Sequence, residues 1–174
     1  KYNKSLIVRS NFFGFCDKNN QSITDKILID QKLKKKTFLW KDIYFTPMYI
    51  PILIFFLNLL LQNNLKGIFN ISSDEVISKF NFGKKVVKKI FKNYDIVPTL
   101  FDNKKFVNRP RNMSLSNKKL KKIFKKYSYK LKIDYQLNMF FKDYKYWIMN
   151  LRFSIIIATK KYSDDLNKTI NSIN

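Results

Sequence analysis

The chain has few of the residues on which many kinds of functional site depend. Its 174 residues include one cysteine, Cys16, three glycines and no histidine. An internal disulfide is therefore excluded, and so is a zinc site of the usual cysteine and histidine kind. Imidazole is also excluded as a catalytic base. The three glycines, Gly14, Gly67 and Gly83, lie too far apart to form a glycine-rich dinucleotide loop or a P-loop.

Acidic residues are scarce as well, since 12 of them face 35 lysines and arginines, for a net charge of +23. Such a charge is typical of nucleic-acid-binding proteins. The composition leans throughout to Lys, Asn, Ile, Phe and Tyr, the residues of AT-rich codons, so we interpret much of the lysine excess as a bias of the genome. We expect no nucleic acid as partner, although a basic surface still favours anionic ligands such as nucleotide sugars.

The hydrophobic content of 45% predicts a packed core, and the longest apolar run, 43–61, raises the question of a membrane span. Pro47 and Pro51 interrupt this run, and proline suits only the first turn of a helix. A helix from about Pro51 to Gln62 would be roughly 18 Å long, short of the roughly 30 Å hydrocarbon core. We therefore predict a helix buried on most faces, in contact with the helix that follows Ser78, and no membrane span. The single thiol fits a reducing cytoplasm, where we expect the protein to act.

Hydrophobic periodicity and capping residues predict an alternation of strands and helices, which indicates an α/β fold. The expected strands are a buried one at 5–9 and others at 37–40, 67–72 and 95–100, with a turn at 11–14 and a short extended piece at 113–115. The expected helices are 22–33, 51–62, 78–91, 117–126 and 134–148. Serines are expected to cap two of them, at Ser78 and Ser116. The apolar side of the third helix is expected to be Phe80, Gly83, Val87 and Ile90.

Two features are candidates for ligand binding. Arg109 and Arg111 bracket Pro110, and the planar guanidinium suits a diphosphate, although both could be ordinary surface arginines. Asn11 follows directly on a strand, where α/β folds bind ligands, although asparagine is also a common turn residue. No tyrosine has a lysine four positions later, which is the catalytic pair of short-chain reductases.

Four pieces of the chain resemble, in order and spacing, dTDP-4-dehydrorhamnose reductase and related nucleotide-sugar-binding proteins of the extended short-chain dehydrogenase/reductase superfamily. They are LIVRSNFFG (6–14), FTPMYIPIL (45–53), GIFNISSDEVISKFNFGKKV (67–86) and RPRNMSLSNKKL (109–120). The resemblance implies that residues 1–148 are the C-terminal, substrate-binding part of a Rossmann-type fold whose nucleotide-binding N-terminal half is missing.

Members of this family reduce a 4-keto group on a nucleotide-linked 6-deoxysugar with NAD(P)H. The resemblance implies that Arg109 contacts the nucleotide diphosphate and that Asn11 and Phe12 line the cleft between cofactor and sugar. Arg111, on the opposite side of Pro110, is expected to matter less for binding. The family's glycine-rich loop and Tyr-xxx-Lys pair would lie before Lys1, so we expect this chain alone to bind no cofactor and to be inactive. Ile52 stands where the family usually has an aspartate, so the entry to that helix should differ.

Residues 149–174 resemble the start of a family 2 glycosyltransferase, with a strand at 153–158, a Thr-containing turn and an amphipathic helix. This terminal βα unit implies either a fusion of two enzymes of surface polysaccharide synthesis or a truncated glycosyltransferase. A non-catalytic nucleotide-sugar-binding subunit is the other alternative, because the cofactor and catalytic motifs are absent.

Overall fold

The computed structural model describes residues 5–15, 22–102 and 110–146. The chain divides into two compact units, Lys1–Leu137 and Asn138–Asn174. Cys16, Arg109 and the glycosyltransferase-like segment 149–174 lie outside the described residues, as does the boundary expected at residue 148.

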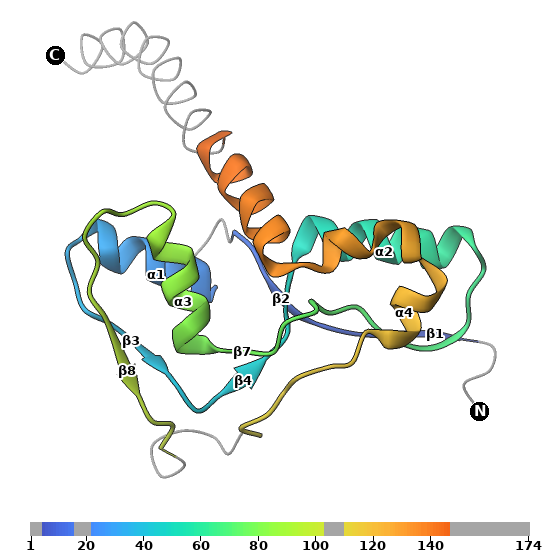
Figure 1. Cartoon of the computed structure of the whole chain (residues 1–174), viewed down its shortest axis with the longest axis horizontal. Coiled ribbons are helices and arrows are strands. Elements are labelled where there is room, and N and C mark those ends of the chain that lie inside the picture. The colour runs from blue at the N-terminus through green and yellow to red at the C-terminus, as the bar shows by residue number, and fades with distance from the viewer. Residues whose placement is uncertain (1–4, 16–21, 103–109, 147–174) are drawn as a thin grey trace, which may run out of the picture. The chain divides into compact units, whose positions relative to one another are not determined.

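The first unit is a mixed α/β structure (Figure 1), in which the strands pair two by two. Three pairs are parallel: β1 (Leu6–Arg9) with β6 (Gly67–Asn70), β2 (Asn11–Phe13) with β5 (Pro47–Tyr49), and β3 (Thr37–Trp40) with β8 (Ile96–Thr99). β4 (Tyr44–Phe45) pairs with β7 (Ile77–Ser78) in antiparallel fashion. The helices are α1 (Ile23–Lys32), α2 (Ile50–Gln62), α3 (Lys79–Lys88) and α4 (Lys118–Ile123), followed by the 3-10 helix η1 (Lys125–Leu131).

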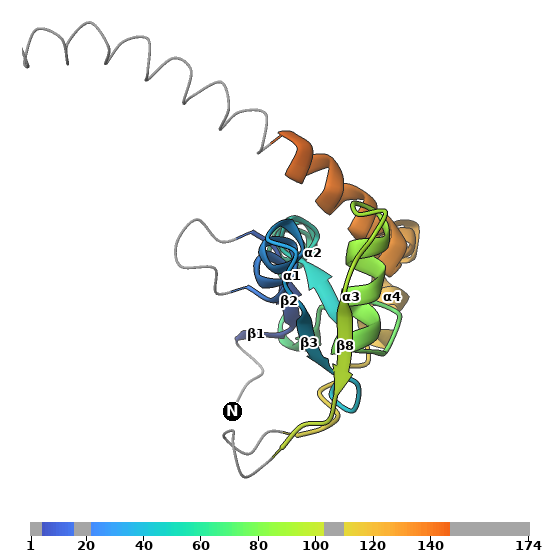
Figure 2. The same ribbon diagram turned by 90° about the vertical axis from the view of Figure 1, so that its left-hand side faces the viewer.

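Serine caps begin both α1 and α3, and the sequence predicts the one at Ser78. The Ser22 hydroxyl accepts the Asp25 amide at 3.0 Å, and the Ser78 hydroxyl accepts the Asn81 amide at 3.2 Å. The two helices pack on each other and on β3, and α3 also packs on β8 (Figures 1 and 2). The expected cap at Ser116 is wrong, because α4 begins one residue later than predicted. Its N-cap residue, Asn117, directs its amide to Ser72 and Asp74 instead.

The core is built around the buried side of α3, which agrees with the predicted side at Gly83 and Val87 but not at Phe80 and Ile90. The buried residues are Phe82, Gly83, Val86 and Val87, whereas Phe80 and Ile90 are half-exposed. The Phe82 ring lies edge-on to Phe13 and Phe45, with centroid distances of 5.1 and 5.4 Å. Gly83 leaves room for Leu39 and Ile27. Helical periodicity alone could not select between these two sides, because both carry apolar residues.

The segment 11–13, predicted as a turn, is the strand β2. It pairs with β5 in the register Asn11 to Pro47 and Phe13 to Tyr49. The isolated sequence NFFG has turn residues at both ends, and only the distant strand 47–49 makes the extended form favourable.

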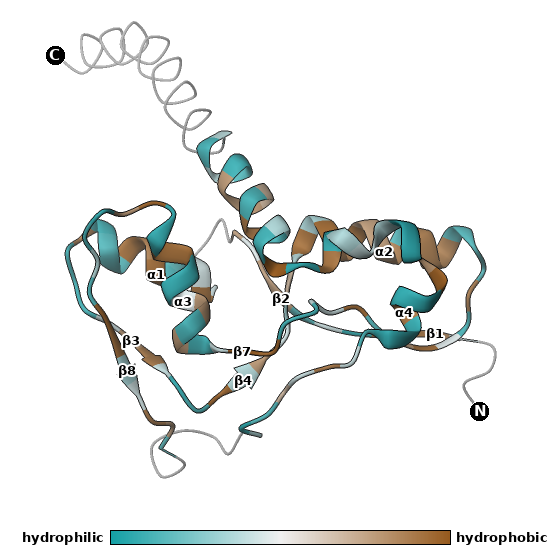
Figure 3. Cartoon of the chain, viewed as in Figure 1, coloured by the Kyte–Doolittle hydropathy of each residue, from teal (hydrophilic) through white to brown (hydrophobic). Residues whose placement is uncertain are grey.

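α2 begins as predicted, with Pro51 in its first turn and no side-chain cap at Tyr49. Hydrophobic residues run along most of its length (Figure 3), but only Ile52, Phe56 and Leu60 are buried. The expectation of burial on most faces is therefore wrong, since Ile54 and Leu61 are 50% and 55% exposed. Its main packing partners among the described elements are β2 and β5, not α3. None of the helices in the described ranges has the length and hydrophobicity to cross a membrane.

β1 is also less buried than its sequence predicts. All three of its apolar residues, Leu6, Ile7 and Val8, are half-buried, and β6 is the strand with which β1 pairs among the described residues. Continuous apolar runs are typical of parallel strands that are covered on both faces and paired on both edges. The last helical stretch, residues 133–146, carries the buried Leu137, Phe140 and Tyr144.

Candidate functional site

Unpaired polar groups lie where the parallel strands β1 and β6 end. The hydroxyl of Ser10 and the side-chain oxygen of Asn70 are buried and have no hydrogen-bond partner within the described part of the chain. Leaving a buried polar group unpaired costs about 1–3 kcal/mol. The carboxyl ends of parallel strands are also the edge at which open α/β sheets bind their ligands. This edge is therefore a place at which a ligand or a further segment would meet unused hydrogen-bonding groups.

Asn11, predicted from its place after β1, holds two segments together. Its side-chain nitrogen donates to the carbonyl of Met113 at 2.7 Å and to the hydroxyl of Thr46 at 3.4 Å. The Thr46 hydroxyl in turn accepts the amide of Leu115 at 3.1 Å. Asn11 thus fastens the segment that follows the Arg-Pro-Arg loop to β2 and β5. Its role in lining a substrate cleft stays a prediction.

Phe12 points to the opposite side of β2 from Asn11 and Phe13. It is 64% exposed, whereas Phe13 is 2% exposed. It borders a hollow of about 370 Å³ at the start of α1, lined by Phe12, Phe13, Gly14, Phe15, Ser22, Ile23 and Ile50. The hydroxyl of Thr24 donates to the carbonyl of Gly14 at 2.7 Å, which ties the first turn of α1 to the end of β2.

A second hollow, of about 310 Å³, adjoins the first at Ser22 and Ile23. It is lined by Ser22, Ile23, Lys26, Phe38, Leu39, Trp40 and Lys79. Phe38 is 55% exposed, and the Lys79 ammonium lies 5.1 Å from the centroid of the Trp40 ring. We call the two hollows together the α1 surface. Phe12, the start of α1, β3 and the start of α3 build it, so segments far apart in the sequence meet there.

The α1 surface is suited to a ligand in which a planar ring lies next to a negatively charged group. Exposed aromatic faces stack on nucleobases, at about 1–3 kcal/mol per base. Lys26 and Lys79 supply positive charge next to Phe38, and the start of α1 contributes the positive end of its helix dipole. Sequence reasoning identified Phe12 and missed the other members. The one available signal was the alternation in 37–40, which leaves the large apolar Phe38 on the side away from the core.

Arg111, the second arginine beside Pro110, forms an ion pair with Asp42 at 3.3 Å and remains 61% exposed. Its carbonyl accepts the amide of Tyr44 at 2.8 Å, and the Tyr44 carbonyl accepts the amide of Met113 at 2.9 Å. The segment 111–113 is therefore placed alongside β4. Asp42 also accepts the amide of Phe101 at 2.9 Å. These contacts give Arg111 a role in positioning the loop, and Arg109 lies outside the described residues.

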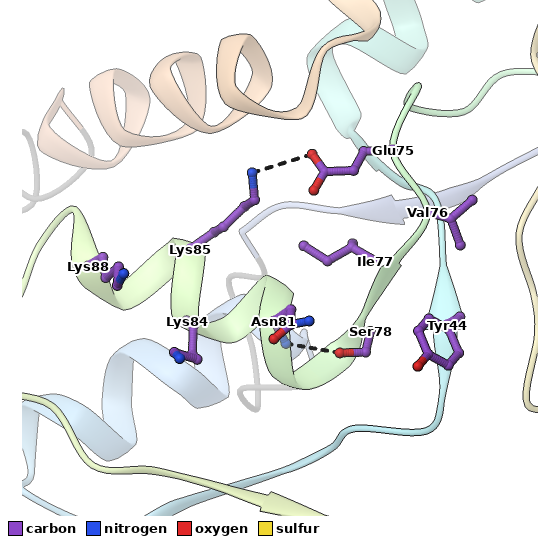
Figure 4. Close-up of a pocket in the computed structure, with 9 residues that line it drawn as sticks. All are labelled: Tyr44, Glu75, Val76, Ile77, Ser78, Asn81, Lys84, Lys85 and Lys88. Carbon is purple, nitrogen blue, oxygen red and sulfur yellow. Dashed lines mark hydrogen bonds and ion pairs between the residues drawn. The ribbon is translucent and has the colours of Figure 1, made fainter.

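A separate groove of about 320 Å³ runs between α3 and the strand β7 (Figure 4). Three lysines, Lys84, Lys85 and Lys88, line it, and Lys85 is shared by two carboxylates, Glu75 and Asp134, each at 3.3 Å. Partial burial acts to lower the pKa of Lys85, but the two carboxylates outweigh it and raise the pKa above its ordinary value of 10.5. The charge of Lys85 is thus compensated within the protein.

Replacing Lys85 with methionine is expected to lower the free energy of unfolding by about 1 kcal/mol or less, because this ion pair is partly exposed. Since the folded-state pKa is raised, the contribution of Lys85 is fully present below pH 10.5 and is lost as the pH rises above it. Urea unfolding of the wild type and of Lys85→Met at neutral pH and near pH 11 measures both effects, with Lys84→Met as control. A stability difference that stays unchanged at high pH would contradict this assignment.

A nicotinamide cofactor does not fit the described residues on their own. Each glycine has a packing or backbone role: Gly14 packs against Ile50, Gly83 packs against Leu39, and Gly67 begins β6 with a φ of +91°. None of them forms a turn that could cradle a pyrophosphate. Among the described residues there is also no cluster of three or more acidic, cysteine or histidine side chains that could hold a metal ion.

No protein-family model and no curated protein match the chain. Solved structures do match it. A hypothetical dTDP-4-dehydrorhamnose reductase from Sulfolobus tokodaii is 24% identical with a TM-score of 0.61, over 70% of this chain and 42% of that one. The dTDP-4-dehydrorhamnose reductase from Bacillus anthracis, in complex with NADP, is 20% identical with a TM-score of 0.65, over 81% and 49%. The Bordetella bronchiseptica enzyme WbmG, in complex with NAD and UDP, is 17% identical with a TM-score of 0.52, over 69% and 38%.

These likenesses establish the fold: the described residues have the arrangement of part of a Rossmann-type, extended short-chain-reductase structure, as the sequence predicted. The chain spans less than half the length of each of these solved structures.

Proposed function

We propose that the α1 surface binds a nucleotide sugar, and that this chain is the substrate-binding part of an NAD(P)-dependent reductase of nucleotide-linked 4-keto-6-deoxysugars. The observation that carries the proposal is the exposed Phe38 beside Lys26 and Lys79, at the start of α1. The same fold occurs in reductases whose names specify dTDP-linked sugars and in an enzyme bound to UDP. Within the proposal, the pathway served is surface polysaccharide synthesis.

In this proposal the base stacks on Phe38, and the lysines attract the diphosphate. Lys79 is held over Trp40 and stands at the first position of α3, so its charge is anchored to a core helix. The segment 111–115 is fixed by Asn11 and Thr46 and carries the Arg-Pro-Arg loop at its start. Cofactor binding and proton donation belong to a part of the fold outside this sequence, because the chain has neither the glycine-rich loop nor the Tyr-xxx-Lys pair.

The test is a calorimetric titration of dTDP into the 174-residue chain. Replacing Phe38 with alanine removes the stacking platform and is expected to weaken dTDP binding by about five- to a hundredfold, which corresponds to about 1–3 kcal/mol. Phe38 is 55% exposed, so its removal should leave the fold intact. Tyr146→Ala is the matched control, because Tyr146 is also a mostly exposed aromatic residue (61%) and lies in the other unit of the chain.

The same samples, mixed with NADPH and a dTDP-4-keto-6-deoxysugar, are expected to oxidise no NADPH. Measurable oxidation would mean that the chain contains its own cofactor site, and the assignment as a substrate-binding part would be wrong. If the wild type and Phe38→Ala bound dTDP with equal affinity, the α1 surface would not be the nucleotide site.

A non-catalytic nucleotide-sugar-binding subunit would behave in the same way in isolation. The two differ once the chain is combined with the dinucleotide-binding half of a related reductase, because only the enzyme part would then restore turnover. A further proposal, which rests on the sequence resemblance, is that residues 149–174 are the start of a glycosyltransferase. Transfer of a sugar by a longer protein that includes this segment would support it.

A further inference from the structure

A further hollow lies at the other end of α1, away from the α1 surface. It has a volume of about 700 Å³ and lies between the end of α1 and the connection from α3 to β8. Figure 1 shows these two segments side by side. The amide of Gln31 joins them, because it donates to the Asp95 carbonyl at 3.1 Å and accepts the Asp95 amide at 2.8 Å. We call this hollow the lysine groove.

The floor of the lysine groove is rigid. Gln31 is 8% exposed, and its side-chain nitrogen also lies 2.8 Å from the Thr37 hydroxyl and 3.2 Å from the Lys35 carbonyl. The two hydrogens of this nitrogen are thus shared among three acceptors, the third being the Asp95 carbonyl. One buried side chain thus fixes the last turn of α1, the turn after it, and the first residues of β3 and β8. A ligand that binds here meets a surface that is already ordered, which lowers the entropy cost of binding.

The walls are basic and aromatic. Lys32, Lys34 and Lys35 line the groove, against the single carboxylate of Asp95. No described carboxylate forms an ion pair with Lys34 or Lys35. Lys85 in the groove of Figure 4 is different, because two carboxylates neutralise it, although Lys84 and Lys88 also line that groove. Phe91 and Tyr94 add aromatic rings beside the lysines.

The backbone also sets Lys34 apart. It has a φ of +53°, in the left-handed region that L-residues other than glycine and asparagine rarely adopt. The equivalent position after α2 has the same conformation, with a φ of +49°, and is occupied by Asn64. The chain thus uses the favourable residue at one helix end and a strained lysine at the other. This lysine, Lys34, is one of the residues that line the groove.

We propose that the lysine groove is a second nucleotide-binding site, in which Lys34 and Lys35 hold the phosphates and the rings of Phe91 and Tyr94 contact the base. Lysine binds phosphate as a point charge, and aromatic faces accept any base, so the groove recognises a phosphorylated base rather than a particular sugar. Its volume lies within the range typical of small-molecule sites, about 300–1,000 Å³. α1 has ten residues and is therefore about 15 Å long, so one mononucleotide cannot occupy the groove and the α1 surface together.

The experiment measures the fluorescence anisotropy of mant-ADP on the full chain at physiological salt. In the double variant Lys34→Gly, Lys35→Ala the affinity is expected to fall by about tenfold or more, since two phosphate contacts are lost. Glycine at position 34 suits the left-handed backbone, so the fold is retained. The control is Lys118→Ala, Lys122→Ala, which removes the same charge from two exposed lysines of α4. Unlabelled pyrophosphate and adenosine, as competitors, separate the phosphate and base contributions.

An equal loss of affinity in both double variants would mean that the probe responds to net charge alone, and would overturn the proposal. Mant-ADP binding that depends on Phe38 and not on Lys34 and Lys35 would also overturn it, and would leave the proposed function of the α1 surface standing. Binding lost only in the groove variant, with dTDP binding at Phe38 retained, would support two independent sites. Displacement of mant-ADP by pyrophosphate, with little effect of Tyr94→Ala, would reduce the groove to a phosphate site and contradict the contact with the base.

Discussion

Phe82→Ala is expected to lower the free energy of unfolding by about 3–5 kcal/mol, because it removes a buried ring and leaves a cavity. Phe82 is fully buried and makes edge contacts with Phe13 of β2 and Phe45 of β4. Small domains are stable by only about 5–15 kcal/mol in total, so this variant should be close to unfolding. The urea midpoint, followed by circular dichroism, measures the loss.

The matched control is Phe80→Ala, two residues earlier on the same helix. Phe80 is half-exposed and lies 5.5 Å from the Lys84 ammonium, so the expected loss is about 1 kcal/mol or less. Equal losses at the two positions would mean that the buried side of α3 is not the one described. A loss of dTDP binding that accompanies partial unfolding of Phe82→Ala would reflect the displacement of β2, which carries Asn11 and Phe12.

Arg109→Ala is expected to weaken nucleotide-sugar binding by about ten- to a hundredfold. The guanidinium can donate to two diphosphate oxygens at once, and hydrogen bonds to charged groups contribute about 1.5–3 kcal/mol. The measurement is calorimetric titration of a dTDP-sugar into a complete enzyme, in which this chain is joined to the dinucleotide-binding half of a related reductase. Arg109 lies outside the described residues, so this prediction rests on the sequence resemblance.

Arg111→Ala is the control on the other side of Pro110. Arg111 already has a partner in Asp42 and is 61% exposed. Exposed ion pairs contribute only about 0–1 kcal/mol, so binding should weaken by less than about fivefold. Small, equal losses for both arginines would mean that the loop is an ordinary surface loop. A larger loss of binding for Arg111→Ala than for Arg109→Ala would mean that Arg111 is the residue that contacts the diphosphate.

The sequence predicted features that depend on neighbouring residues. Ser78 caps α3, and Pro51 stands in the first turn of α2, because a cap or a proline acts within one turn of the chain. The expected strand at 37–40 also agrees with the structure. The order and spacing of four short segments identified the fold, which the solved structures share.

The tertiary structure decided what depends on distant partners. β2 is a strand because residues 47–49 pair with it, and the buried side of α3 is set by Phe13, Leu39 and Phe45 rather than by its own period. The α1 surface joins Phe12, Lys26, Phe38 and Lys79, which no spacing relates. The local sequence determines whether each short segment favours a helix, a strand or a turn, because the interactions involved lie within a few residues. How the segments are arranged depends on which apolar side chains are buried against one another. These contacts form only when the whole chain is packed.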